Sequence, residues 1–346
     1  ALGHKKYDAP LESDIDAMAG TVSGWVRRCE KLADIATDAV AAIEAAQQGQ
    51  VATLILPADV SWTEGAEPAV GHDHHAVCPS AQGDRVLEIG LGGERAVLHL
   101  RLDEYALDAL QPLTAIVYRR LSAVAGALGY PYFLRIWHYF PRINQEYQGV
   151  ERYRAFCAGR YQALEAELTA FETQLPAASA IGTDSPGLQL YALAAKEPGV
   201  QIENPRQVSA FHYPPQYGRR SPSFSRAVLK NWGEGHEHLY ISGTASIVGH
   251  ASQHGDLLPQ LAETLANLEA LLAEADRRAT TPLELALLKI YVRPNLDPAP
   301  LRDRIVRTFG ANVPLLFLRA DICRQELLLE IEGLATSGDH PRDNAS

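Results

Sequence analysis

The sequence lacks the features by which several large classes of protein are recognised. It has four cysteines in 346 residues and no Cys-X-X-Cys pair, so neither a disulfide framework nor a zinc-binding spacing is indicated. It has no run of about 18 consecutive apolar residues, the length that spans a membrane, and the N-terminal residues ALGHKKYDAP contain no apolar signal core. These absences predict reduced thiols and a cytoplasmic protein.

The chain also lacks a surplus of positive charge. Its formal net charge is -11, and a negative chain is repelled by nucleic acid and by anionic membranes. We therefore expect neither partner, whereas a pocket that gathers arginines could still bind a small anion. The expected state is a monomer or a weak oligomer.

Motifs that hold cofactors are missing as well. Gly90-Leu-Gly92-Gly93 lacks the third glycine of a dinucleotide fingerprint and joins two expected strands, which indicates a hairpin turn. Neither a P-loop nor a Gly-X-Ser-X-Gly elbow occurs. His250 and His254 are four residues apart, but the glycines around them would not hold a helix. We predict no metal and no organic cofactor.

Hydrophobic periodicity divides the chain into segments. Residues 1–66 favour an α/β fragment, whose apolar run at 51–57 is typical of a buried parallel strand. Residues 67–83 carry no period and are rich in Gly, Ala, Pro and His, as linkers are. Two units follow, over 84–200 and 201–335, and residues 336–346 are expected to be a disordered tail.

Each of the two units shows the same order: strands, helix, strand, helix, two strands. The expected helices span 107–128, 150–174, 257–275 and 298–309, and the expected strands span 85–90, 95–101, 131–140, 177–183, 188–195, 207–213, 225–229, 238–242, 288–292, 315–321 and 326–332. This order favours an α+β fold of two similar units, in which helices cover one face of each mixed sheet. A cleft between such units is a natural ligand site.

One group of candidate site residues lies at the ends of strands between 203 and 256. Period-two alternation places Phe224 and Arg226 on one face of a strand, and Tyr213 and Gly243 lie near other strand ends. An arginine beside an aromatic ring can hold a carboxylate bidentately, and a glycine lets backbone N–H groups approach an oxyanion. The alternative for Arg226 is a solvated surface position.

A second candidate lies on the last expected strand. Leu328, Glu330 and Glu332 point one way, and the surrounding leucines could desolvate a carboxylate. Desolvation raises the pKa of a carboxyl group and makes it a general acid near neutral pH. The alternative is a solvated stripe of glutamates, and Cys323 would then be a small buried apolar residue.

Two further arginines, Arg293 and Arg160, extend the candidate site. Arg293 ends the strand at 288–292, where it could face a cleft or solvent. In the helix at 150–174, the spacing places Tyr153, Cys157 and Arg160 on one face. Arg152 and Arg154 lie off that face, and we expect them to be solvated.

Residues 84–335 resemble the chorismatase family. The resemblance is carried by GYPYFLRIW at 129–137, GVERYRAFCAGR at 149–160, ENPRQVSAFHY at 203–213 and SPSFSR at 221–226, and by shorter matches at 180–183, 241–246, 320–323 and 328–332. The C-terminal half is also similar to the RidA/YjgF fold, through Phe224-Ser, Ser242-Gly243 and Glu330-Ile-Glu332. This implies two RidA/YjgF-like units with most of the site in the second.

The resemblance implies an enzyme that cleaves the enolpyruvyl ether of chorismate and releases pyruvate without a cofactor. Arg226, Arg293 and Arg160 would hold the two carboxylates of the substrate, Tyr213 would orient it, and Glu330 would protonate the enolpyruvyl methylene.

Cys323 resembles the residue of the hydroxybenzoate-forming branch of the family, so the expected ring product is 3-hydroxybenzoate. Hydrolysis to a dihydroxycyclohexadiene carboxylate is an alternative. A RidA-like imine hydrolase or metabolite-binding module is an alternative of another class.

Residues 4–62 are similar to part of a thiamine-diphosphate enzyme domain of the acetolactate synthase type. The similarity is carried by HKKYDAPL at 4–11, VSGWV at 22–26 and ATLILPADVSW at 52–62. The first half of that domain, with the region of its catalytic glutamate, has no counterpart here. Thiamine catalysis is therefore not expected.

Overall fold

The computed structural model describes residues 25–28, 31, 38, 41, 52–55, 85–91, 94–102, 109–184 and 186–337. The chain divides into two compact units, residues 1–75 and 76–346. In the first unit, strands β1 (Trp25–Arg28) and β2 (Ala52–Ile55) pair in parallel. The remainder of the α/β fragment expected for residues 1–66 and the linker expected for 67–83 lie outside the described residues.

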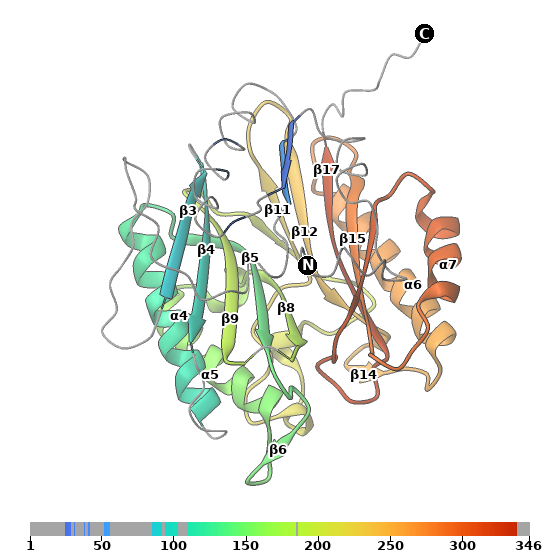
Figure 1. Ribbon diagram of the computed structural model, residues 1–346, viewed down its shortest axis with the longest axis horizontal. Helices are drawn as coiled ribbons and strands as arrows, with labels where there is room; N and C mark the ends of the chain where they lie inside the picture. The colour runs from blue at the N-terminus through green and yellow to red at the C-terminus, as the bar shows by residue number, and fades with distance from the viewer. Residues whose placement is uncertain are drawn as a thin grey trace. The chain divides into compact units, whose positions relative to one another are not determined.

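Two β-sheets form the second unit (Figure 1). The first sheet has the order β3-β4-β9-β5-β8, built from β3 (Arg85–Leu91), β4 (Arg95–Leu102), β5 (Tyr132–Phe140), β8 (Ala177–Gly182) and β9 (Leu188–Ala195). The second has the order β10-β11-β12-β17-β15-β16, built from β10 (Val200–Ile202), β11 (Ala227–Asn231), β12 (Glu237–Thr244), β15 (Glu284–Val292), β16 (Leu315–Arg319) and β17 (Leu329–Ser337). Short hairpins are formed by β6 (Glu146–Tyr147) with β7 (Val150–Glu151) and by β13 (Ile247–Val248) with β14 (Ala251–Ser252).

The two sheets repeat one topology. Apart from β10, the strands β11-β12-β17-β15-β16 occupy the places of β3-β4-β9-β5-β8 in the same sequential order. In both sheets the pair that flanks a helical crossover is parallel, namely β5 with β8 and β15 with β16, and the last strand inserts antiparallel beside the first of them. The predicted α+β fold with two similar units is confirmed.

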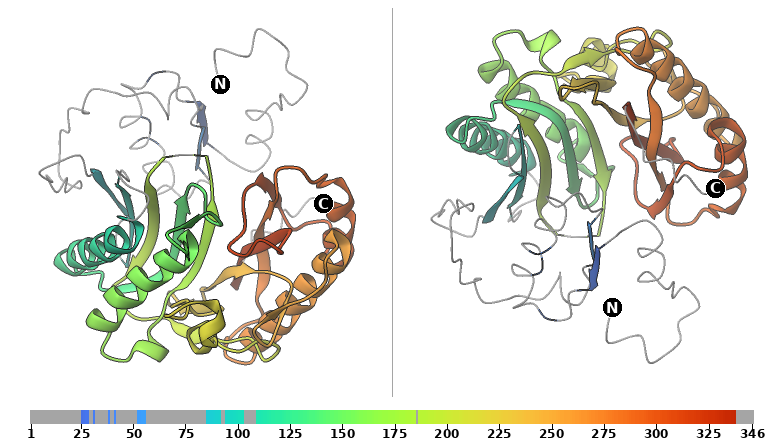
Figure 2. Two further views of the ribbon diagram at one scale, coloured as in Figure 1. Left: turned by 90° about the horizontal axis from the view of Figure 1, so that it is seen from below. Right: turned by 90° about the horizontal axis from the view of Figure 1, so that it is seen from above.

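Four helices cover the outer faces of the two sheets (Figure 2). Helices α4 (Leu110–Ala127) and α5 (Arg152–Glu167) pack on the first sheet, and α6 (Leu257–Asp276) and α7 (Ala299–Phe309) pack on the second. Their apolar residues recur every three or four positions, as in Leu261, Leu265 and Leu268 of α6, and these side chains are buried. Each such leucine contributes roughly 1.5–3 kcal/mol of transfer free energy.

The inner faces of the sheets meet in further apolar clusters. Leu134 and Leu193 of the first sheet pack with Val228 and Tyr240 of the second. At the same boundary, the Ala178 N–H donates to Ser242 Oγ at 2.7 Å.

The structure corrects one predicted strand and two predicted boundaries. Residues 207–213 are not a strand: they lead into 3₁₀ turns at Ala210–His212 and Pro215–Tyr217, where Pro214 and Pro215 have no N–H to donate to a ladder. Helix α5 ends at Glu167 rather than 174. Strand β17 spans Leu329–Ser337, so residues 336 and 337 belong to this strand and not to the expected tail.

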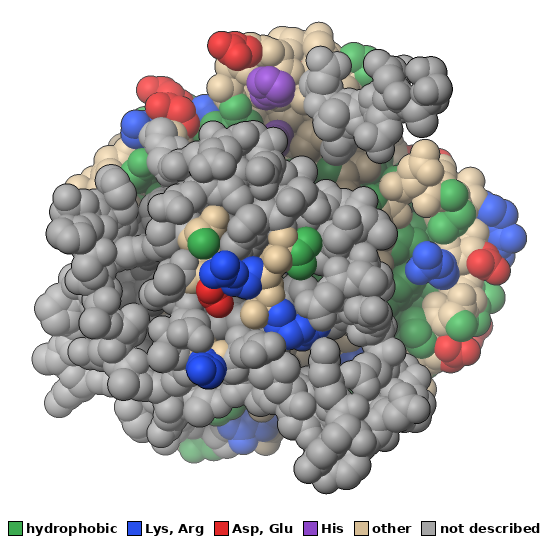
Figure 3. All heavy atoms as spheres, turned by 45° about the horizontal axis from the view of Figure 1, so that its top comes forward, with side chains coloured by type: hydrophobic (Ala, Val, Ile, Leu, Met, Phe, Trp, Pro, Cys, Tyr) green, Lys and Arg blue, Asp and Glu red, His purple; other side chains and the backbone are tan. Residues whose placement is uncertain are grey.

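The described part of one face carries charges of both signs. Among the side chains coloured in Figure 3, basic and acidic groups lie next to one another rather than separating by sign. Across the described helices, none is long and apolar enough to cross a bilayer.

Candidate active site

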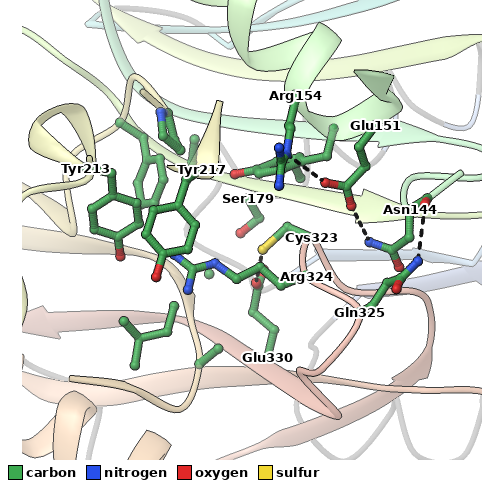
Figure 4. A pocket seen from close by; sticks show the side chains of 18 of the residues that line it. Asn144, Glu151, Arg154, Ser179, Tyr213, Tyr217, Cys323, Arg324, Gln325 and Glu330 are labelled. Atoms are coloured by element: carbon green, nitrogen blue, oxygen red, sulfur yellow. Dashed lines mark hydrogen bonds and ion pairs between the residues drawn. The ribbon is translucent and has the colours of Figure 1, made fainter. Parts of the chain in front are cut away.

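A cavity of about 300 Å³ lies within the second unit, lined by residues of both sheets. Helix α5 and strand β8 line one side, and Gly243 of β12 and Glu330 of β17 line the other. The loops at 213–226 and 323–326 complete the wall, and Figure 4 shows Tyr213, Tyr217 and Arg324 from these loops around it. The cavity therefore joins residues far apart in sequence.

Glu330 is a buried carboxyl group at the cavity wall. Its side chain is on the same face of β17 as Glu332, as predicted, and the residue is 4% exposed. Its nearest hydrogen-bonding partner is Cys323, whose Sγ lies 3.9 Å from Oε2 (Figure 4). Burial, and then the negative charge of Glu332, raise the pKa of Glu330 to about 8. Near neutral pH this group therefore carries a proton.

Glu332, two residues along the same strand, is the opposite case. Its carboxylate accepts hydrogen bonds from five side chains: Arg135 Nη2 at 2.7 Å, Ser179 Oγ at 2.5 Å, Trp137 Nε1 at 2.9 Å, Tyr291 OH at 3.2 Å and Lys289 Nζ at 3.0 Å. Burial acts to raise the pKa of Glu332, but Arg135 and Lys289 hold it below its ordinary value. The different surroundings of these two neighbouring carboxyl groups thus shift their pKa values in opposite directions.

Gly243 leaves room for the Glu330 side chain. A Cβ atom added at position 243 would collide with the Glu330 carboxyl group. The glycine is needed here for this close approach, because its backbone lies directly against the carboxyl group. This is a more specific reason than the general access for oxyanions that the sequence indicated.

Arg160 presents a buried positive charge to the cavity. It is 3% exposed, and its Nε and Nη2 atoms make no hydrogen bond within the part of the chain that the structure describes. Its guanidinium lies 5.5 Å from the centre of the Tyr118 ring. A buried cation of this kind lacks an anionic partner in the described structure, and a bound anion would supply one.

A neutral pair of side chains supports Arg160. His138 Nδ1 lies 2.7 Å from the carbonyl oxygen of Ser179, which can only accept, so Nδ1 carries the proton. The hydroxyl of Tyr118 then donates to His138 Nε2 at 2.5 Å. Burial, and then Arg160, lower the pKa of His138 well below its ordinary value. Because Tyr118 and His138 are both neutral, they do not compensate the positive charge of Arg160.

Arg226 is held on the opposite side by aromatic side chains. Its Nη2 donates to the hydroxyl of Tyr213 at 2.7 Å and to the carbonyl oxygen of Val208 at 2.9 Å. Its guanidinium lies 5.3 Å from the centre of the Phe224 ring. The structure thus brings Tyr213, Phe224 and Arg226 together at the cavity, as the sequence predicted, and places Arg226 in a buried position rather than on the surface.

Arg324 lines the cavity and was missed by sequence reasoning. Its guanidinium lies 4.0 Å from the centre of the Tyr217 ring, and its Nη1 donates to Ser252 Oγ at 2.9 Å and to the His250 carbonyl oxygen at 3.1 Å (Figure 4). The only signal in the sequence was its position next to Cys323.

Arg293 does not line the cavity, which corrects its predicted role as a carboxylate clamp. Its guanidinium is engaged by the loop that carries Cys323 and Arg324: Nε donates to the Leu327 carbonyl oxygen at 2.7 Å, and Nη1 pairs with Asp321 at 2.8 Å. Nη2 donates to Asn144 Oδ1 at 3.1 Å. With its donors used in this way, Arg293 fixes the loop instead.

The first turn of α5 also differs from expectation. Arg152 is buried, with Nε donating to the Pro141 carbonyl oxygen at 3.1 Å. Arg154 lines the cavity and pairs with Glu151 at 3.3 Å. Arg152 therefore contradicts the expected solvated position, whereas Arg154 is exposed, as expected, and lines the cavity at the same time.

Tyr153 and Cys323 complete the described wall near Glu330. Both line the cavity, and burial raises the pKa of each above its ordinary value, so both are protonated near neutral pH. Cys157, which the sequence places on the same helix face, is packed into the core behind them. Cys323 is therefore a neutral thiol beside Glu330 rather than a thiolate.

Potential metal ligands are scattered among the described residues. Within those residues, no cluster of three or more His, Cys, Asp or Glu side chains has the geometry to hold an ion. The histidines at 72–75 lie outside the described residues. His250 and His254 have separate neighbours, Tyr217 and Glu263.

The arrangement combines a proton donor with positive charge. Arg160, Arg226 and Arg324 line a cavity in which the buried Glu330 holds a proton. Such a site can bind a small dianion and protonate a weakly basic carbon or oxygen of it.

Comparisons with known proteins agree on one family. The model of the N-terminal domain of FkbO/Hyg5-like chorismatases matches residues 79–194. The chain is 36% identical over 234 residues to a 3-hydroxybenzoate synthase of Streptomyces hygroscopicus, covering 64% of this chain and 68% of that protein. A crystal structure of a chorismatase superposes with a TM-score of 0.65 at 33% identity, covering 76% of this chain and 79% of that one.

A separate match concerns another class of protein. Over 99 residues the chain is 56% identical to IlvX of Mycobacterium tuberculosis, which is named after the large subunit of acetolactate synthase. The match covers 28% of this chain and 19% of IlvX. The match agrees with the resemblance of residues 4–62 to that type of enzyme. Because it covers so small a share of IlvX, it is no evidence that this chain has the activity of that enzyme.

Proposed function

This chain belongs to the chorismatase family, and we propose that it cleaves the enolpyruvyl ether of chorismate to give pyruvate and 3-hydroxybenzoate. The observation that carries the proposal is a protonated carboxyl group, Glu330, in a cavity lined by arginines. Chorismate is a dianion with a vinyl ether, and the site offers a matching set of groups: cations for the carboxylates and an acid for the vinyl carbon.

Substrate binding in this proposal uses the arginines of two sides of the cavity. Arg160 binds one carboxylate through the Nε and Nη2 atoms that have no partner among the described residues. Arg226 and Arg324 bind the other, and Tyr213, which Arg226 holds at 2.7 Å, orients the substrate. Arg324 takes the place in the site that the sequence had suggested for Arg293.

The reaction then proceeds through protonation of carbon. Glu330 gives its proton to the enolpyruvyl methylene, which produces an oxocarbenium ion and leaves Glu330 as a carboxylate. The neighbouring ring hydroxyl attacks the ring carbon that bears the ether oxygen, the bond to that oxygen breaks, and pyruvate leaves with its ketone formed. The hydroxyl proton returns to Glu330, and the ring isomerises to 3-hydroxybenzoate. No water is consumed.

Cys323 supports internal attack over hydrolysis. Its thiol lies 3.9 Å from Glu330 and packs against apolar neighbours in two clusters. A thiol is a weak hydrogen-bond partner, and burial raises the pKa of this one, so it is a poor base for activating a water molecule. Attack by the ring hydroxyl of the substrate needs no such water.

The proposal is tested with purified protein and chorismate in water enriched in heavy oxygen. We expect equal amounts of pyruvate and 3-hydroxybenzoate, and we expect no label in the ring product, because its phenolic oxygen comes from chorismate. A dihydroxycyclohexadiene carboxylate in place of 3-hydroxybenzoate would assign the chain to the hydrolytic branch, in which water adds to the oxocarbenium carbon and the heavy oxygen leaves in pyruvate. Absence of pyruvate above background would refute the proposed reaction.

Replacing Gly243 with alanine is expected to lower kcat by about 10- to 100-fold, because the new methyl group displaces the Glu330 carboxyl group from its position and a shift of about 1 Å costs that much. The KM for chorismate should change little, since no arginine moves. Steady-state kinetics measures both. Gly255→Ala is the matched control, since a Cβ atom there meets no neighbour. An unaltered kcat in Gly243→Ala would mean that the carboxyl group is not confined by this glycine.

A further inference from the structure

We propose that Glu332 is a positioning residue of this site, held as a permanent anion so that the adjacent Glu330 retains its proton. The inference rests on the proposed function for its role in turnover. It assigns a purpose to an ionic cluster that lies outside the cavity lining: Glu332, Arg135, Lys289, Trp137 and Tyr291, here called the β17 ionic cluster.

The geometry of the β17 ionic cluster allows little freedom to Glu332. Both carboxylate oxygens are engaged by donors from three elements, β5, β8 and β15. Lys289 is the direct register partner of Glu332 across β15 and β17, and Tyr291 is that of Glu330. Because the cluster bridges both sheets, the negative charge of Glu332 keeps a fixed place relative to Glu330.

The effect of the cluster on the protonation of Glu330 follows from the charges of its members. Arg135 and Lys289 carry two positive charges, and Glu332 carries one negative charge. Without Glu332, two cations would lie near Glu330 without an anion between them and would draw the proton off it. With Glu332 present, one of the two positive charges is cancelled.

The other groups that face Glu330 are either neutral or change its pKa less than Arg135 does. Cys323, from the loop before β17, is a neutral thiol and donates to the carboxyl group. Tyr153, from α5, is a neutral phenol. Arg226, which precedes β11, acts on Glu330 less than Arg135 does. Glu332 and Arg135 are therefore the charges that act most on its protonation, and Lys289 pairs with Glu332 at 3.0 Å.

Two substitutions in the cluster should act in opposite directions. Glu332→Gln removes the anion, so Glu330 should lose its proton at lower pH than in the wild type. Lys289→Met removes one cation, so Glu330 should keep its proton to higher pH. Lys289 is the milder change, because a quarter of its side chain is exposed. The double variant has the net charge of the wild-type cluster and should restore its behaviour.

The closing experiment measures the protonation of Glu330 in two ways. Infrared difference spectra against Glu330→Gln follow its protonated carboxyl band over pH without substrate. Single-turnover pyruvate formation from chorismate gives the pH at which the chemical step is half-maximal. We expect both midpoints to fall by at least about one pH unit in Glu332→Gln and to rise in Lys289→Met, with the double variant near the wild type.

The outcomes separate this inference from the proposed function. Midpoints that stay in place, or that move in the same direction in both single variants, would overturn the role of Glu332. Should Glu332→Gln not fold, Lys289→Met alone decides, since a midpoint that does not rise contradicts the charge balance. A protein that shifts its infrared midpoints as expected but makes no pyruvate would retain the inference about the cluster and refute the reaction.

Discussion

Replacing Glu330 with glutamine is expected to lower the turnover of chorismate by about 10²- to 10⁴-fold, the usual contribution of a general acid, with little change in its dissociation constant. Glutamine has the size of the protonated acid and forms the same kind of neutral contact with Cys323, but its amide does not give up a proton near neutral pH. Single-turnover kinetics measures the chemical step, and calorimetry with the inactive variant measures binding.

The pH dependence of the wild type follows from the same group. Its pKa is raised to about 8, so the acid form predominates below that pH, and the rate should fall as the pH rises through it. The unfolded carboxyl group ionises near 4.5, so the folded state binds more protons between these values and loses stability as the pH rises across this window. At pH 7, Glu330→Gln should therefore unfold at a temperature no lower than the wild type.

Glu284→Gln serves as the control for this substitution. Glu284 is an exposed glutamate of β15, outside the cavity lining. It should leave turnover, binding and the pH profile as they are. A Glu330→Gln protein that turns chorismate over at a rate close to wild type would remove Glu330 from the role of acid and with it the proposed chemistry.

Much of the fold was predictable because each element carries its own pattern. The apolar spacing in α6 and the alternation in β3 and β4 are local signals, and the order of elements in both halves indicated the repeat that the sheets show. The segment 207–213 was mispredicted because its apolar residues resemble a strand locally. The prolines that follow it and its contacts with other loops decide the 3₁₀ turns instead.

The candidate site was predictable only in part, and the reason is distance in sequence. Leucines around Glu330 indicated a desolvated carboxyl group, and that signal lies in one strand. The partners of Glu332 come from β5, β8 and β15, and no local pattern relates Arg135 to a residue 197 positions away. The same limit of local patterns applies to Arg293 and Arg324. Arg293 directly follows a strand and Arg324 lies in a loop, and only the folded structure decides which of the two lines the cavity.

Replacing Arg160 with methionine is expected to have opposite effects on function and on stability. Loss of a buried, hydrogen-bonded partner of a charge costs about 2–5 kcal/mol, so kcat/KM for chorismate should fall by about 10²-fold or more, mainly through a weaker complex. The protein without substrate should become more stable, because a buried cation without an anion is replaced by an apolar side chain of similar volume. Steady-state kinetics and thermal unfolding with and without ligand measure both effects.

Arg152→Met, in the same helix, provides the contrast for Arg160→Met. Arg152 is as deeply buried, but its Nε donates to the Pro141 carbonyl oxygen and it lies outside the cavity lining. Its loss leaves that carbonyl unsatisfied, so Arg152→Met should lower stability and preserve the KM. If Arg160→Met instead unfolded at lower temperature and bound chorismate as well as before, Arg160 would be a structural cation. The dianion would then have to be held by Arg226 and Arg324 alone. Arg324 already donates to His250 and Ser252, and Nη2 of Arg226 donates to Val208 and Tyr213, which leaves only the Nε of Arg226 buried without a partner among the described residues. We therefore expect the first result.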